Sequence, residues 1–280
     1  FMTKKETNNE FINDLILEDY HKLSIQVSLN GLSFCILDTI GKKIVKAEKQ
    51  SFDNRLTPYE AQKELKRFIK KQQIKEYAFS EVVVVHRNDL FSLVPKVLFD
   101  PDELANYLKF NTKILANDLL EYDEIPAFEM VNIYVPFVNI NNFIYELFGD
   151  FEFKHHGTVL IESLLSSNAH SSEGICYAYV TADELDLIVL QNKKLIFFNN
   201  FTYHTPEDFL YYLLFTWEQL HLDPSEMKLR LFGSIKEDDP MYSLCQNYVQ
   251  HISLYIPGLP DDLLDDETAK NANYLAINAL

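Results

Sequence analysis

The stretch ICYAYVTADELDLIVLQNKKLIFFNNFTY, residues 175–203, is predicted to form three consecutive β-strands joined by two tight turns. Its apolar residues alternate or run together as they do in buried strands, and polar residues separate the runs. A second stretch, KLSIQVSLNGLSFCILDTIGKKIVKAEKQSF at residues 22–52, has the same pattern. In both, a Lys-Lys pair follows the second turn. We therefore predict that the chain contains one fold twice.

The segments that follow the two stretches support this duplication. Residues 57–60 (TPYE) and 205–208 (TPED) each combine a threonine N-cap, a proline at the first helical position and an acidic first turn. Further on, residues 130–156 are aligned with residues 228–254 as strand, helix and strand. An alternative alignment pairs the EVVVVH strand, residues 81–86, with the KLRLF strand, residues 228–232.

Each half is thus predicted to be β-β-β-α-β-α-β-α, an α/β fold with mixed sheets that is typical of ribonuclease H-like domains. Two such domains in tandem, one with an inserted subdomain, predict the actin-like ATPase fold. The predicted divisions are a polar N-terminal segment, two domains and an insertion. They are 1–19 for the polar segment, 20–170 for the first domain, about 79–128 for its insertion, and 171–280 for the second domain, with the boundary at the small polar run 168–174.

Charge and composition exclude several classes of protein. The 280-residue chain has 25 Lys and Arg against 42 Asp and Glu, a net charge of −17, which opposes binding to nucleic acid or to anionic membranes. The three cysteines lie far apart in apolar runs without a CxxC pattern, so we expect buried, reduced thiols. No run approaches the roughly 18 apolar residues of a membrane span, and no signal peptide is recognisable. A cytoplasmic location is predicted.

Three segments carry a resemblance to a known family. They are FSLVPKVLFDPDELANYL at 91–108, MVNIYVPFVNINNFIYELFGDFEFKHHGTVLIESLL at 130–165, and ANYLAINAL at 272–280. With these segments the chain resembles an uncharacterised bacterial family, a Bacteroidetes-type domain of unknown function whose members are assigned an actin-like ATPase fold. It is more remotely similar to the pilus-assembly protein PilM, the secretion protein GspL and the division protein FtsA.

The resemblance implies where a nucleotide would bind. In this group two Asp-x-Gly hairpins hold the ATP phosphates, because glycine lets backbone N–H groups approach them. Here the first hairpin has Gln26 and Ser28 at those positions. The second, residues 180–184 (VTADE), has no glycine and two carboxylates, which repel a triphosphate. We predict no ATP hydrolysis and no cofactor. The alternative is Mg-ATP held by five cleft residues: Asn30, Gly31, Ser33, Gly233 and Ser234.

Other chemistries find little support in the residues. Neither of the two strands that would begin a nuclease domain carries the acidic residue that a two-metal site needs. His155 and His156 are adjacent, so on a strand they are expected to point to opposite faces and not to share a metal ion. No metal site is predicted. A metal hydrolase using Asp183, Glu184 or Asp186 is kept as a further hypothesis.

The helix FLYYLLFTW, residues 209–217, has more large side chains than one core stripe requires. Tyr211, Tyr212 and Phe215 are therefore expected to form an exposed apolar patch that marks a partner surface. We interpret the chain as a catalytically inert actin-like protein, a cytoplasmic protein-interaction or scaffold module for a protein or short peptide partner. A homodimer is compatible with this hypothesis. The alternative is a nucleotide-binding actin-like ATPase.

Overall fold

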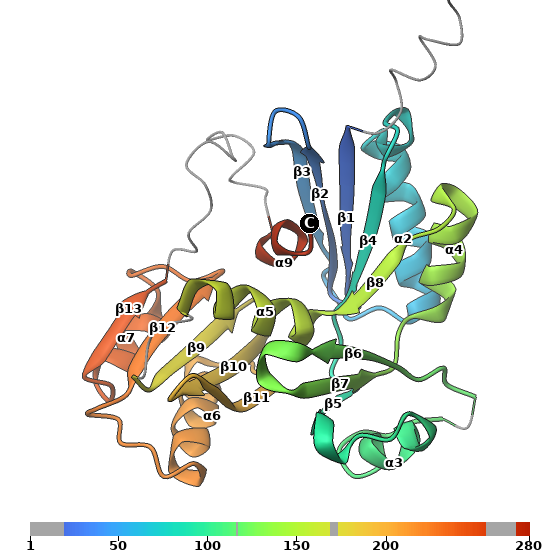
Figure 1. Cartoon of the computed structure of the whole chain (residues 1–280). Helices are drawn as coiled ribbons and strands as arrows, with labels where there is room; N and C mark the ends of the chain where they lie inside the picture. The colour runs from blue at the N-terminus through green and yellow to red at the C-terminus, as the bar shows by residue number, and fades with distance from the viewer. Residues whose placement is uncertain (1–19, 116, 169–172, 256–272) are drawn as a thin grey trace, which may run out of the picture.

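Three β-sheets organise the chain, and two of them share one strand order (Figure 1). The computed structural model describes residues 20–115, 117–168, 173–255 and 273–280. In this part of the chain the two five-stranded sheets have the orders β3-β2-β1-β4-β8 and β11-β10-β9-β12-β13, and a three-stranded sheet has the order β5-β7-β6. The prediction of a mixed α/β fold is confirmed.

The first sheet is an antiparallel three-strand meander extended by two parallel strands. Its strands are β1 (His21–Val27), β2 (Gly31–Asp38), β3 (Lys43–Ser51), β4 (Glu81–His86) and β8 (Glu152–His155). Alternation along β1 directs Leu23, Ile25 and Val27 into a core. Two helices, α2 (Pro58–Lys71) and α4 (Val138–Phe148), cover that face of the sheet.

The second sheet has the same arrangement. Its strands are β9 (Ile175–Val180), β10 (Glu184–Gln191), β11 (Lys194–Thr202), β12 (Lys228–Gly233) and β13 (His251–Leu254). The register shifts once in each meander, between Ile36 and Leu37 in β2 and between Val189 and Leu190 in β10. Helices α6 (Pro206–Gln219) and α7 (Pro240–Gln246) cover its outer face, and Trp217 is fully buried there.

The first helix after each meander starts in the same way. In α2 the Thr57 side chain accepts from the backbone N–H of Glu60, while the Glu60 carboxylate accepts from the backbone N–H of Thr57. Thr205 and Asp208 form the corresponding capping box at α6. Proline follows the cap in both helices, as the sequence predicts.

The three-stranded sheet corrects two details of the sequence prediction. It consists of β5 (Phe91–Pro95), β6 (Glu121–Ile125) and β7 (Met130–Tyr134), with α3 (Leu104–Leu108) packed on it. Single 3₁₀ turns accompany these elements at Lys96–Leu98, Pro101–Glu103 and Pro126–Phe128, and another at Ile74–Glu76 follows α2. Because β4 lies between β1 and β8, it corresponds to β12. The strand orders therefore favour the alternative alignment, which pairs β4 with β12, over the preferred alignment of β7.

The positions of β4 and β7 also shift the bounds of the insertion that was predicted at about 79–128. β4 belongs to the first five-stranded sheet, so the block begins after it, and β7 belongs to the insertion although it lies beyond residue 128. Both strands are short and mostly apolar, and such a pattern does not reveal which neighbours a strand pairs with.

Two helices pack against the sheet of the other half of the chain (Figure 1). Helix α5 (His156–Asn168) follows β8 of the first sheet, and its Leu160 and Leu164 are buried against Tyr177 and Tyr179 of the second sheet. Helix α9 (Tyr274–Asn278) comes at the C-terminal end, and its Ala276 packs on Cys35 and Ala47 of the first sheet. The two sheets are therefore joined by apolar contacts in both directions.

Some predictions lie outside the described residues. These are the polar segment 1–19 and most of the proposed boundary at 168–174. Within the described part, no helix is long and apolar enough to cross a lipid bilayer. All three cysteines are buried free thiols, as predicted.

His86, at the end of β4, is buried in its neutral form. Its Nε2 lies 2.8 Å from Asn141 Oδ1, and its Nδ1 accepts the backbone N–H of Phe137 at 3.3 Å. Because Nδ1 accepts, the proton of the neutral ring is on Nε2 and donates to Asn141. Burial lowers the pKa of His86 to about 4, although the hydrogen bond with Asn141 acts in the opposite direction.

We expect the free energy of unfolding to fall as the pH drops from about 6.5 toward 4, because only the unfolded chain takes up a proton on His86 in this range. The shift corresponds to roughly 3 kcal/mol. Urea unfolding across this range should therefore show a shallower pH dependence for His86→Gln than for the unmodified chain.

Two other buried groups titrate nearby, so the comparison with the variant is needed. Burial lowers the pKa of His155 as well, which adds to the loss at low pH. Burial raises the pKa of Asp123 to about 6, so its contribution is present below pH 4 and is lost as the pH rises through 6. An identical pH dependence in His86→Gln would contradict the assignment to His86.

Candidate functional site

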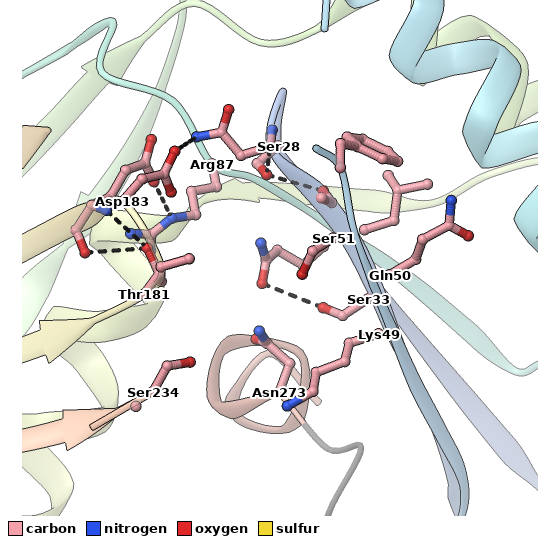
Figure 2. Close-up of a pocket in the computed structure, with 18 of the residues that line it drawn as sticks. Ser28, Ser33, Lys49, Gln50, Ser51, Arg87, Thr181, Asp183, Ser234 and Asn273 are labelled. Atoms are coloured by element: carbon pink, nitrogen blue, oxygen red, sulfur yellow. Dashed lines mark hydrogen bonds and ion pairs between the residues drawn. The ribbon is translucent and has the colours of Figure 1, made fainter. Parts of the chain in front are cut away.

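A cavity of about 580 Å³ lies between the two five-stranded sheets, within the size range of small-molecule sites. Its walls come from the β1–β2 turn, β3, the β9–β10 turn, the end of β12 and the start of α9 (Figure 2). The structure brings together on this cavity all five residues that the sequence suggested for a nucleotide: Asn30, Gly31, Ser33, Gly233 and Ser234.

Backbone packing accounts for the two glycines of this set. Gly233 has φ +95°, and a Cβ on it would lie 2.3 Å from the carbonyl oxygen of Val180. A Cβ on Gly31 would lie 2.7 Å from the carbonyl oxygen of Gln50 in the neighbouring strand β3. Both positions thus need glycine because two strands approach closely, whether or not a ligand is bound.

Arg87, directly after β4, connects the two sheets at the floor of the cavity. Its side chain is only 3% exposed. Its Nε donates to Glu184 Oε2 at 2.7 Å, and its Nη2 lies 2.7 Å from Asp186 Oδ2. The guanidinium also lies over the Tyr179 ring, 5.2 Å from the centroid. One cation of the first half is therefore held by two carboxylates of β10 in the second half.

Arg87 and Asp186 hold each other in their charged forms. Burial opposes a charged guanidinium, but Asp186 and Glu184 together raise the pKa of Arg87 above its ordinary value. Burial likewise acts against a charged Asp186, yet Arg87 and then His156 hold the pKa of this carboxyl well below its usual range. Removal of Arg87 would leave two buried carboxylates without their cation.

A second direct contact joins the two turns that flank the cavity. Asn30, in the β1–β2 turn, donates from Nδ2 to Asp183 Oδ2 in the β9–β10 turn at 2.7 Å. Burial, and after it the charge of Glu184, raises the pKa of Asp183. The resemblance implies that these two turns hold phosphates in actin-like ATPases. Here the turns contact each other instead.

The histidine pair differs from its prediction. His155 ends β8 and His156 begins α5, so the two rings do not alternate as on a strand, and their centroids lie 4.3 Å apart. Both rings are fully buried. His156 Nε2 lies 3.0 Å from Asp186 Oδ1, and His155 lies 3.0 Å from the Asn132 amide of the three-stranded sheet. The pair thus joins all three sheets.

No metal-binding cluster of three His, Cys, Asp or Glu side chains is found among the residues that the structure describes. Of the three acids considered for a metal hydrolase, Glu184 and Asp186 face Arg87, and Asp183 accepts from Asn30. The Arg87 guanidinium therefore contacts the two carboxylates, Glu184 and Asp186, that a metal ion would otherwise bind.

Several lining residues were not identified from the sequence. Arg87 follows a strand that reads as ordinary core, and Lys49 and Asn273 belong to no motif. For Arg87 the sequence offered one indication: it directly follows a buried strand, at the sheet edge where β1 ends and the β1–β2 turn begins. Polar residues at the ends of parallel strands commonly face a cleft, so this position could have been considered.

Residues 9–252 match a family described as Protein of unknown function (DUF3822). The chain belongs to the DUF3822 family. The predicted resemblance to a family of unknown function is therefore confirmed. No curated protein matches the chain.

Two solved structures share the fold of this DUF3822 member. A Bacteroides thetaiotaomicron protein of unknown function with an actin-like ATPase fold has a TM-score of 0.77 at 21% identity, over 92% of this chain and 97% of that one. A chain of the PilM–PilN type IV pilus biogenesis complex has a TM-score of 0.60 at 11% identity, again over 92% of this chain and 97% of that one. These likenesses establish the actin-like ATPase fold.

Replacing Arg87 should strongly destabilise the protein. In Arg87→Met, Glu184 and Asp186 stay buried without their cation, and we expect the free energy of unfolding to fall by about 3–5 kcal/mol in urea unfolding. Arg55→Met is the matched control, because the ion pair of Arg55 with Asp89 is about half exposed. It should cost less than about 1 kcal/mol. Equal losses in both variants would contradict the role given to Arg87.

Proposed function

We propose that this DUF3822 protein is a non-hydrolysing actin-like protein that acts as a protein-interaction or scaffold module. The observation that carries the proposal is the direct contact between its two halves at Arg87 and Asp183. Arg87 pairs with Glu184 and Asp186, and Asn30 binds Asp183. These contacts occupy the region in which the resemblance places the phosphates of ATP.

Electrostatics supports this proposal. A triphosphate between the two turns would have to break the hydrogen bond between Asn30 and Asp183. It would then face the carboxylates of Asp183 and Glu184. Arg87 offers no free positive charge, since two carboxylates already neutralise it. The same contacts hold the two halves together, which suits a protein that presents a constant surface to a partner.

Two exposed apolar areas offer surfaces for such a partner. In the inserted part Val97 is 89% exposed and Phe110 is 83% exposed. On α6 the rings of Tyr211 and Phe215 stack with centroids 5.6 Å apart and stay largely exposed. Tyr212, which was expected to belong to this patch, instead stacks on Phe201 and is partly buried. The structurally similar PilM chain belongs to a complex with PilN, which favours a protein partner here.

The alternative function is nucleotide binding, with Mg-ATP as the ligand. It is favoured by the volume of the cavity and by the presence of Asn30, Ser33 and Ser234 on its wall. A cytoplasmic location remains part of the proposal for both functions.

We expect no thermal stabilisation and no phosphate release with Mg-ATP, Mg-ADP or Mg-GTP at concentrations up to about 5 mM. A ligand that binds the folded state at this concentration would raise the melting temperature. Differential scanning fluorimetry and a phosphate-release assay, run beside an active actin-like ATPase, give the measurement. A saturable rise of several degrees would reject the proposed function in favour of the alternative.

A partner that uses either apolar area should be lost when that area is altered. We expect Phe110→Ser or Tyr211→Ser to remove one interaction in affinity purification from the native cell with quantitative mass spectrometry. Both side chains are exposed, so folding should be unaffected. Ile40→Ser, in the exposed β2–β3 turn, is the control and should retain every interaction. Identical profiles for all three variants would exclude both areas as partner surfaces.

A further inference from the structure

Two opposite charges face the cavity from its two sides without an ion-pair partner. Lys49 extends from β3 of the first sheet, and Asp183 lies in the β9–β10 turn of the second (Figure 2). Lys49 makes no side-chain hydrogen bond or ion pair within the described part of the chain. Asp183 accepts a hydrogen bond from the neutral Asn30 amide. The other charged groups near the floor, Arg87 and Glu184, pair with each other.

The rest of the lining is dominated by neutral hydrogen-bonding side chains. They are Gln26, Ser28, Asn30, Ser33, Gln50, Ser51, Asn54, Thr181, Ser234 and Asn273. Asp53 and Arg55 lie at the rim, where both are exposed to water. Among the described lining residues, the exposed Lys49 thus offers a positive group and the partly buried Asp183 a negative group, with mostly uncharged polar side chains between them.

Three kinds of small ligand can be compared against this lining. A triphosphate places its charge against Asp183 and Glu184. A neutral sugar leaves both Lys49 and Asp183 unmatched. A molecule with an ammonium group and a carboxylate matches both, and charged hydrogen bonds of this kind are the stronger ones. An ammonium group beside Asp183 would also offset the burial and the neighbouring charge of Glu184 that raise the pKa of this carboxyl.

We propose that the cavity binds a small zwitterion, with its ammonium group on Asp183 and its carboxylate on Lys49. Free amino acids and short peptides both have this pair of groups, and they differ in the distance between them. The proposal goes beyond the function proposed above, because it assigns a ligand to the cavity and not to the apolar surfaces.

A series of glycine, diglycine, triglycine and tetraglycine tests the proposal and shows which distance between ammonium and carboxylate fits the cavity. Titration of the full chain is followed by NMR line shifts and by the melting temperature. We expect one length to bind saturably in the millimolar range or below. The N-acetylated and C-amidated forms of that peptide should each bind at least tenfold more weakly. None of these compounds contains phosphate, so the result is independent of the Mg-ATP assay.

Variants of Asp183 and Lys49 then test whether the ligand binds in the cavity. Asp183→Asn and Lys49→Gln should each weaken binding at least tenfold, and both preserve side-chain size. Asp238→Asn and Lys43→Gln remove the same charges at exposed positions outside the cavity and should leave the affinity unchanged. The proposal is rejected if no length binds, if the capped peptides bind equally well, or if the cavity variants bind like their controls.

Discussion

The buried guanidinium of Arg87 is the interaction on which the relation between the two halves depends. It lies at the end of a strand in the first sheet, and both of its carboxylate partners are on one strand of the second. In a nearly dry environment such a group is stable only while its partners stay in place. The halves therefore cannot separate at this point without exposing three charges or leaving them unpaired.

Apolar packing reinforces the same contact. Helix α5 leaves the first half and covers the inner face of the second sheet, while α9 covers the inner face of the first. His156, the first residue of α5, is within hydrogen-bond distance of Asp186, the carboxylate that also pairs with Arg87. The position of the helix and the orientation of the ion pair are thus coupled. A cavity lies beside them, and the side chains of β1, β2 and β3 that line it are mostly polar.

Much of the fold could be predicted from local patterns. Alternation in residues 22–52 and 175–203 predicted both meanders, and the TPYE and TPED segments predicted two helix starts that the structure shows as capping boxes. The candidate site could be predicted in part from the sequence, since Asn30 and Ser234 follow strands whose ends meet at the cavity. Lys49 and Arg87 were not identified, because a single charged residue within a strand or directly after one does not show which distant residues it will face. The histidine pair was misjudged, since a helix begins between its two members.

The sequence by itself determined which segments form strands and helices, since periodicity and capping act over only a few residues. It also determined that phosphate-type hairpins with glycine are missing from residues 180–184. Only the tertiary structure decided that β4 and not β7 lies between β1 and β8. Only it decided that Arg87 would meet Glu184 and Asp186, residues about a hundred positions away along the chain. Strand pairing and buried ion pairs depend on contacts between distant residues, and these contacts exist only once the chain has folded.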